Sequence, residues 1–194
     1  EHSEAQSIVE NILNLNANLN DTVILYRLNA QSRIIEDTLL RNAIPYKVLG
    51  GLRFYDRKEI KDISSYLRLI VNTNDDIALR RVINEPKRGI GNTTLERVYS
   101  ISVRNSLSMF EVCERADEFD EFNSSASAKL KKFSELINNF KRELDEGMGL
   151  ELFVKLVMKG SGMIEALSTE KTVENQTRLE NLDEFISMVQ EAVR

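Results

Sequence analysis

The sequence is poor in the residues that carry most enzyme chemistry. Its 194 residues include one cysteine, one histidine, two prolines and no tryptophan. A single cysteine, Cys113, cannot form an internal disulfide, so we expect a reducing cytoplasmic location. Because His2 is the only histidine, a zinc site built from several His and Cys ligands is also excluded. We interpret Cys113 as a small helix side chain and assign no function to His2.

Long apolar runs and phosphate-binding loops are absent as well. No stretch approaches about 18 consecutive apolar residues, so we expect no transmembrane helix. The first residues, EHSEAQS, lack the basic start and apolar run of a signal peptide. Since residue 1 is not Met, we expect a piece of a longer protein. No G-x-x-x-x-G-K-[ST] loop, and no G-x-G-x-x-G after a strand, is present. We therefore expect no cofactor, metal or catalytic residue in this piece.

The overall composition, 42% hydrophobic and 29% charged, is that of a globular protein with one or two domains. The net charge of −5 argues at first against a nucleic-acid partner. It hides an asymmetry, because residues 27–104 hold fifteen Lys/Arg against nine Asp/Glu, a local charge of +6. The remainder of the chain carries −11. A basic middle between acidic ends favours a DNA-binding face, with chance fluctuation along a charged chain as the alternative.

The first fifty residues alternate between helical and strand patterns. Apolar spacing predicts helices over 3–19 and 30–42, the second capped by Asn29, and strands over 22–26 and 46–48. Such alternation is typical of an α/β sheet. Two strands cannot complete one, so we expect this region to belong to a larger α/β domain.

Beyond Gly51 the strand patterns disappear and the fold class becomes mainly α. Asp56 and Glu59 are spaced as a capping box that would open a helix over 57–72. Further helices are predicted over 75–84, 92–105, 107–116, 126–146, 149–159 and 171–192. The polar stretch 117–127 is predicted to be a surface loop.

The helix 57–72 has two chemically different sides at ~100° per residue. Its apolar side carries Ile60, Ile63, Leu67 and Ile70. The opposite side carries Lys58, Lys61, Ser65 and Arg68. Such a cationic stripe can follow a phosphate backbone, and an ordinary solvated helix face is the alternative.

The segment 86–94, PKRGIGNTT, lies between two predicted helices. Glycines on both sides of Ile90 allow close backbone approach to a ligand, while Ile90 itself can enter the core. The next helix begins near Asn92, and a helix N-terminus suits a phosphate. This arrangement favours a helix-hairpin-helix grip on duplex DNA without base readout, with a plain helix–helix turn as the alternative. The candidate duplex contacts are Lys61, Arg68, Lys87, Arg88, Gly89, Ile90, Gly91, Asn92, Thr93 and Thr94.

Four blocks of the chain together resemble the UvrD/PcrA/Rep group of superfamily 1 DNA helicases. The blocks are LYRLNAQSRIIEDTLL (25–40), IPYKVLGGLRFYDRKEIKDISSYLRLIVN (44–72), NEPKRGIGNTTLERV (84–98) and QTRLENLDEF (176–185). Their order and spacing match across nearly the whole chain, except for 105–170, which carries little of the shared pattern. The resemblance implies that residues 1–53 are part of the RecA-like motor subdomain 2A and residues 54–194 the helical subdomain 2B.

The resemblance also implies a function. Arg27 and Asn29 would contact the single strand, and the residues already selected on the stripe and hairpin would hold the duplex. The parent would be an ATP-dependent 3′-to-5′ helicase of replication and repair that uses ATP and Mg²⁺ bound elsewhere. Its partners would be a single-strand/duplex DNA junction, the rest of the helicase chain and repair or replication proteins, with no membrane. Two alternatives remain: a non-enzymatic helical protein-interaction domain, and the matching region of an AddA/RecB-like helicase–nuclease subunit.

Overall fold

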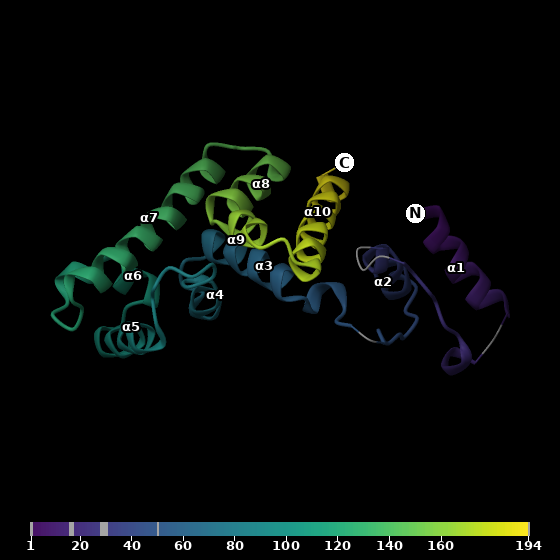
Figure 1. Cartoon of the computed structure of the whole chain (residues 1–194), viewed down its shortest axis with the longest axis horizontal. Coiled ribbons are helices and arrows are strands. Elements are labelled where there is room, and N and C mark those ends of the chain that lie inside the picture. Colours follow the sequence, from purple (N-terminus) through teal and green to yellow (C-terminus); the bar gives the residue numbers. More distant parts are fainter. Residues whose placement is uncertain (1, 16–17, 28–30, 50, 194) are drawn as a thin grey trace.

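The computed structural model describes residues 2–15, 18–27, 31–49 and 51–193, and helices dominate all of it (Figure 1). The helices are α1 (His2–Leu15), η1 (Leu19–Asp21), α2 (Ser32–Arg41), η3 (Phe54–Asp56), α3 (Lys58–Val71), α4 (Asp76–Val82), α5 (Asn92–Asn105), α6 (Met109–Glu114), η4 (Ala116–Glu118), α7 (Ser124–Asp145), α8 (Leu150–Gly160), α9 (Met163–Thr169) and α10 (Val173–Val193). The described residues contain no strand, so the predicted mainly α class is confirmed.

The two predicted strands, 22–26 and 46–48, are not formed. Both segments are irregular in the structure, and neither pairs with another strand. A strand needs a neighbour to accept its backbone hydrogen bonds, and the described part of the chain supplies none. Val23 and Leu25 are instead 69% and 89% exposed. The strand prediction is therefore wrong for this structure.

Buried apolar side chains form two separate clusters. The smaller one unites Val9, Ile12, Leu39 and Ile44 from α1, α2 and the loop that follows. The larger one runs from Phe54 to Val189 and draws on every α-helix from α3 to α10. We call the described residues up to 53 the N-terminal arm and those from 54 onward the helical body. Figure 1 shows the arm at one end of an elongated molecule.

Most helices of the body begin and end close to the predicted positions, but only some of them begin with a side-chain cap. Asp75 caps α4, since its side chain accepts a hydrogen bond from the Ala78 amide. The predicted capping box at Asp56 and Glu59 is wrong. The residue before α3 is Arg57, which makes no side-chain cap. Asp56 instead pairs with Lys61 and Arg53, and Glu59 is buried.

The structure differs from the predictions at two further places in the body. The loop predicted over 117–127 is shorter, because Asn123 caps α7 by accepting from the Ala126 amide and Phe122 is buried. The helix α9 was not predicted. It has only seven residues and starts after Gly162, whose φ of +85° lies in the left-handed region that favours glycine.

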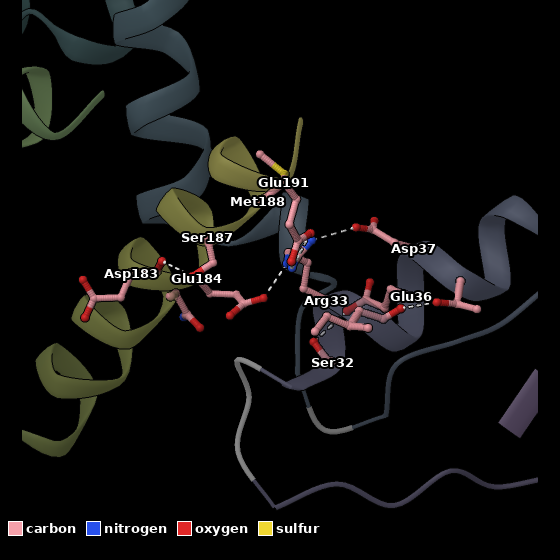
Figure 2. A network of polar contacts seen from close by, with 12 residues as sticks. Ser32, Arg33, Glu36, Asp37, Asp183, Glu184, Ser187, Met188 and Glu191 are labelled. Carbon is pink, nitrogen blue, oxygen red and sulfur yellow. Dashed lines mark hydrogen bonds and ion pairs between the residues drawn. The ribbon is translucent and has the colours of Figure 1, made fainter. Parts of the chain in front are cut away.

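Polar contacts join the arm to the body. Arg33 of α2 is 2% exposed and forms ion pairs with Asp37 on its own helix and with Glu184 and Glu191 of α10 (Figure 2). Arg57 makes a second link, donating to Asn181 of α10 and to Ser32 of α2, both at 2.7 Å. Every buried side-chain N or O atom in the described ranges has a hydrogen-bond partner.

Candidate nucleic-acid interface

The segment between α4 and α5 is a tight hairpin held by one side chain. The Asn84 side-chain oxygen accepts from the Arg88 amide at 2.8 Å and from the Ile90 amide at 3.2 Å. Ile90 is 3% exposed and belongs to the body core, as the sequence predicted. Gly89 has a φ of +70°, so an L side chain would be strained there. The loop is therefore anchored from inside by Asn84 and by the buried Ile90.

The Arg88 side chain turns toward the protein rather than outward. Its guanidinium donates to the Val82 carbonyl at 3.1 Å, to the Tyr66 hydroxyl at 2.7 Å and to the Ser161 carbonyl at 2.7 Å. It also lies over the Phe133 ring, 5.6 Å from the centroid. The sequence assigned Arg88 to DNA. In the structure its guanidinium instead ties the hairpin to α3 and to the α8–α9 link.

Tyr66 completes this internal support. Its hydroxyl donates to the Glu85 carbonyl at 2.6 Å and accepts from Arg88. Burial raises the pKa of Tyr66 to about 12, against a lowering effect of Arg88. The phenol therefore remains a hydrogen-bond donor at neutral pH.

The outer edge of the hairpin is formed by Gly91 and the first turn of α5. Gly91 is exposed, has an ordinary φ of −82° and has no atom within 4 Å of the position that a Cβ would take. It is the N-cap of α5 and offers no side-chain cap. The first backbone N–H groups of a helix have no intrahelical acceptor, so they are open to an anion here. Asn92 and Thr93 are exposed and Thr94 is half-buried beside them.

Carboxylates offset the predicted cationic stripe on α3. Lys61 lies 2.9 Å from an Asp56 oxygen, and Arg68 lies 2.6 Å from an Asp75 oxygen. The hydrogen bond from Lys61 is the main cause that lowers the pKa of Asp56. The pKa of Asp75 is lowered chiefly by the Ala78 amide and then by Arg68. Ser65 is buried, which breaks the stripe between its two halves.

The structure places the stripe and the hairpin in limited contact. Lys58 reaches the base of the hairpin through an ion pair with Glu85 at 2.8 Å. No hydrogen bond or ion pair in the described part of the chain joins Lys61 or Arg68 to the hairpin. Lys87 is exposed beside the hairpin, and no ion pair of the described residues involves it.

Sequence reasoning missed two residues that hold the hairpin in place. The helical pattern predicts Asn84 only as the end of the helix over 75–84, although its side chain organises the loop. Lys129 of α7 donates from Nζ to the Gly89 carbonyl at 3.2 Å. No sequence signal pointed to Lys129, because the contact spans forty positions. The polar residues that precede it at the start of α7 gave only a loop prediction.

The two candidate single-strand contacts belong to the arm. Arg27 is exposed, and its amide donates to the Gln31 side chain at 3.1 Å. Asn29, the other candidate and the predicted cap of α2, lies outside the described residues.

The described ranges contain no exposed thiol and no cluster of metal ligands. Cys113 is buried, and burial raises the pKa of its thiol. Three or more His, Cys, Asp or Glu side chains placed to hold a metal ion do not occur among the described residues. Nor does that part of the chain contain a helix long and apolar enough to cross a membrane.

Comparison with known proteins matches the whole chain, residues 1–194, to the family described as UvrD-like helicase C-terminal domain. The chain is 42% identical over 191 residues to an ATP-dependent DNA helicase PcrA of Staphylococcus aureus. It is 41% identical over 191 residues to the protein of the same name from Staphylococcus epidermidis. Each alignment covers 97% of this chain and 26% of the relative, so the chain spans about a quarter of the length of these curated relatives.

Proposed function

This chain belongs to the family of UvrD-like helicase C-terminal domains, and we propose that it holds duplex DNA within an ATP-dependent DNA helicase. The longer protein would unwind DNA in the 3′-to-5′ direction during replication and repair, in the cytoplasm, together with repair or replication proteins. The relatives are ATP-dependent DNA helicases by name, which supports the helicase activity.

The open N-terminus of α5 at Gly91 is the observation that carries the proposal. Uncapped N–H groups and the positive end of the helix dipole together attract phosphate. The fold does not require a glycine at position 91, because its φ is ordinary and the space beside it is empty. A glycine there does allow the closest approach of a phosphate to the backbone. Contacts of this kind position a duplex without reading its bases.

We also propose a division of the chain at residue 53. Residues 1–53 would be part of subdomain 2A, and residues 54–194 would be subdomain 2B. The two separate apolar clusters support this division. Exposed Arg27, together with Asn29, is proposed to contact the single strand.

ATP and Mg²⁺ are proposed to bind in other parts of the longer protein. The chain has no phosphate-binding loop sequence of the kind that holds a nucleoside triphosphate. We accordingly expect the 194-residue chain to hydrolyse no ATP, with or without DNA.

A pair of glycine variants tests the duplex-holding role. Gly149 is a matched control, because it is also an exposed N-cap glycine with open space around it, at the start of α8. Binding of a labelled hairpin duplex is measured by fluorescence anisotropy over a range of salt. The unaltered chain should bind weakly, with a Kd no tighter than about 10⁻⁶ M, and lose affinity steadily with salt.

Gly91→Val should weaken binding at least about tenfold, because one or more hydrogen bonds to a charged phosphate are lost. Gly149→Val should leave it unchanged. Equal affinity of the two variants and the unaltered chain would contradict the proposed contact. Absence of any salt-dependent duplex binding by the unaltered chain would contradict the function and favour a helical protein-interaction domain.

A further inference from the structure

Lys129 brings a positive charge to the outer side of the hairpin from a distant helix. Its Nζ lies 3.2 Å from the Gly89 carbonyl oxygen. A Cβ added to Gly89 would lie 2.9 Å from the same nitrogen, so the ammonium group lies directly against the hairpin backbone. Gly91 follows two residues later, at most about 7 Å along the chain. The ammonium group therefore contacts the hairpin two residues before the N-cap of α5.

The charge of Lys129 is not offset, in contrast to the charges on α3. Lys58, Lys61 and Arg68 each form an ion pair with a carboxylate. Within the described ranges, the partner of the Lys129 ammonium is a neutral carbonyl. A carbonyl orients the ammonium group without neutralising it, so the full charge remains available to an anion.

None of the residues that neighbour Lys129 along α7 has an acidic side chain. Residues three and four positions away on a helix are neighbours, and for Lys129 these are Ser125, Ala126, Lys132 and Phe133. Ser125 and Lys132 are exposed. The first acidic residue after Lys129 on the helix is Glu135, which neighbours Lys132 rather than Lys129. This start of α7 therefore presents small and basic side chains next to the hairpin.

We propose that Lys129 is a duplex-DNA contact, and that the exposed start of α7 (Ser125, Lys129 and Lys132) forms a second wall of the interface beside the hairpin. This inference rests on the proposed function, because it assigns a further residue to the same site. The ligand group is a backbone phosphodiester, bound between the Lys129 ammonium and the first turn of α5. The positive charge of the interface would then come from α7 and Lys87 rather than from α3.

The test compares three variants of the 194-residue chain. Lys129→Ala removes the charge and the hydrogen bond to Gly89, whereas Lys129→Gln removes the charge but keeps a donor. Lys141→Ala is the matched control. It removes the same charge from an exposed lysine of the same helix, twelve residues and about 18 Å farther along. Circular dichroism verifies that all three remain folded.

Duplex affinity is measured by anisotropy between about 0.1 and 1 M salt, over which the Debye length falls from about 10 Å to about 3 Å. Each phosphate contact contributes about 0.9 to the salt slope. Both Lys129 variants should therefore lower the slope by about 1 and weaken binding about eightfold at the low-salt end relative to the high-salt end. Lys141→Ala should change neither quantity.

The outcomes separate the two proposals. If the unaltered chain binds duplex and Gly91→Val weakens it, but Lys129→Ala behaves as Lys141→Ala does, the Lys129 contact is overturned and the proposed function stands. If Lys129→Gln binds like the unaltered chain while Lys129→Ala does not, Lys129 only braces the hairpin and the contact is again overturned. If the unaltered chain shows no duplex binding, the proposed function itself fails.

Discussion

The N-terminal arm and the helical body differ in how much of their apolar surface they bury. The body closes on itself: its core includes fully buried side chains such as Tyr66, Phe133 and Phe153. Among the described residues of the arm, only four buried apolar side chains form a cluster, and other apolar side chains are exposed, among them Val23, Leu25, Leu49 and Leu52. The body is therefore expected to be stable alone, and the arm to depend on its neighbours.

The contacts between the two regions are chiefly polar. Arg33 of the arm pairs with Glu184 of α10 (Figure 2), and Ser32 accepts a hydrogen bond from Arg57 of the body. Glu36 alone accepts hydrogen bonds from Ser32, Tyr46 and the Phe54 amide. Buried polar networks fix one geometry but lose much of their stabilisation when a single member is removed. The arm should therefore detach before the body unfolds.

Matched leucine-to-alanine substitutions should show the largest difference. Leu79 is fully buried in α4 of the body, and Leu39 is 4% exposed in α2 of the arm. Leu79→Ala should lower the free energy of unfolding of the body by about 2–5 kcal/mol, because it leaves a cavity. Leu39→Ala should lower only the local stability of the arm. Urea unfolding and amide hydrogen exchange measure the two effects, and equal loss of body stability in both variants would contradict the separation.

Replacing Arg33 should have the next largest effect. Arg33→Met leaves Asp37, Glu184 and Glu191 without their common cation, and breaking a fully buried pair costs about 3–5 kcal/mol. Because Glu191 is 39% exposed, we expect a smaller loss here, about 2 kcal/mol. The loss should appear as faster hydrogen exchange in α1 and α2 with α3 to α8 still protected. Arg115→Met, which removes an exposed ion pair with Glu118, should leave stability nearly unchanged because solvent screens that pair. Unchanged exchange in the Arg33→Met arm would show that other contacts hold it.

The sequence predicted the local part of the candidate site and failed where the answer depends on tertiary contacts. The position of α5 and the inward Ile90 follow from neighbouring residues, and both agree with the structure. The inward turn of Arg88 depends on Tyr66 and on Ser161, which lies 73 positions away. The pairing of Lys61 and Arg68 with carboxylates, and the approach of Lys129, depend likewise on the packed arrangement. Helical periodicity cannot reveal such contacts.

The failure of the strand predictions has a different physical cause. The β-branched and apolar residues of 22–26 do favour a strand. Strand formation also requires a partner that accepts the backbone hydrogen bonds, and the described residues provide none at this position. Both irregular segments instead line an open hollow of about 750 Å³. The overall mainly α class was predictable because a helix satisfies its backbone within its own segment.

Alkaline pH should weaken the contacts between the arm and the body, because two tyrosines at this junction ionise. Burial, and then the hydrogen bond with Glu36, raise the pKa of Tyr46 to about 12. Burial, and then the charge of Asp37, raise the pKa of Tyr55 to about 12. A raised folded-state pKa gives stability that is complete below the unfolded value of 10.0 and is lost as pH rises through about 12. Protection of the arm from exchange should fall in that window.

A double variant identifies the groups responsible. Tyr46→Phe with Tyr55→Phe removes both hydroxyls, so the arm should lose its pH dependence between about 10 and about 12. The body should keep its own alkaline loss, because burial also raises the pKa of Tyr66 to about 12. Tyrosinate absorbance follows the ionisation, and an unchanged pH profile of arm protection in the double variant would refute the assignment.

The smallest expected effect concerns the exposed apolar surface of the arm. Leu25 is 89% exposed, so Leu25→Ser removes no packing contact of note and should change the stability of the 194-residue chain by less than about 0.5 kcal/mol. Leu39→Ser, the control in the same region, should unfold the arm because Leu39 belongs to its small core. In the proposed longer helicase, strands of a completed sheet would cover Leu25. The same Leu25→Ser substitution should then destabilise that longer protein by roughly 2 kcal/mol or more. Thermal unfolding of both proteins decides this, and a Leu25→Ser helicase as stable as its parent would show that residues 22–26 do not enter a sheet there either.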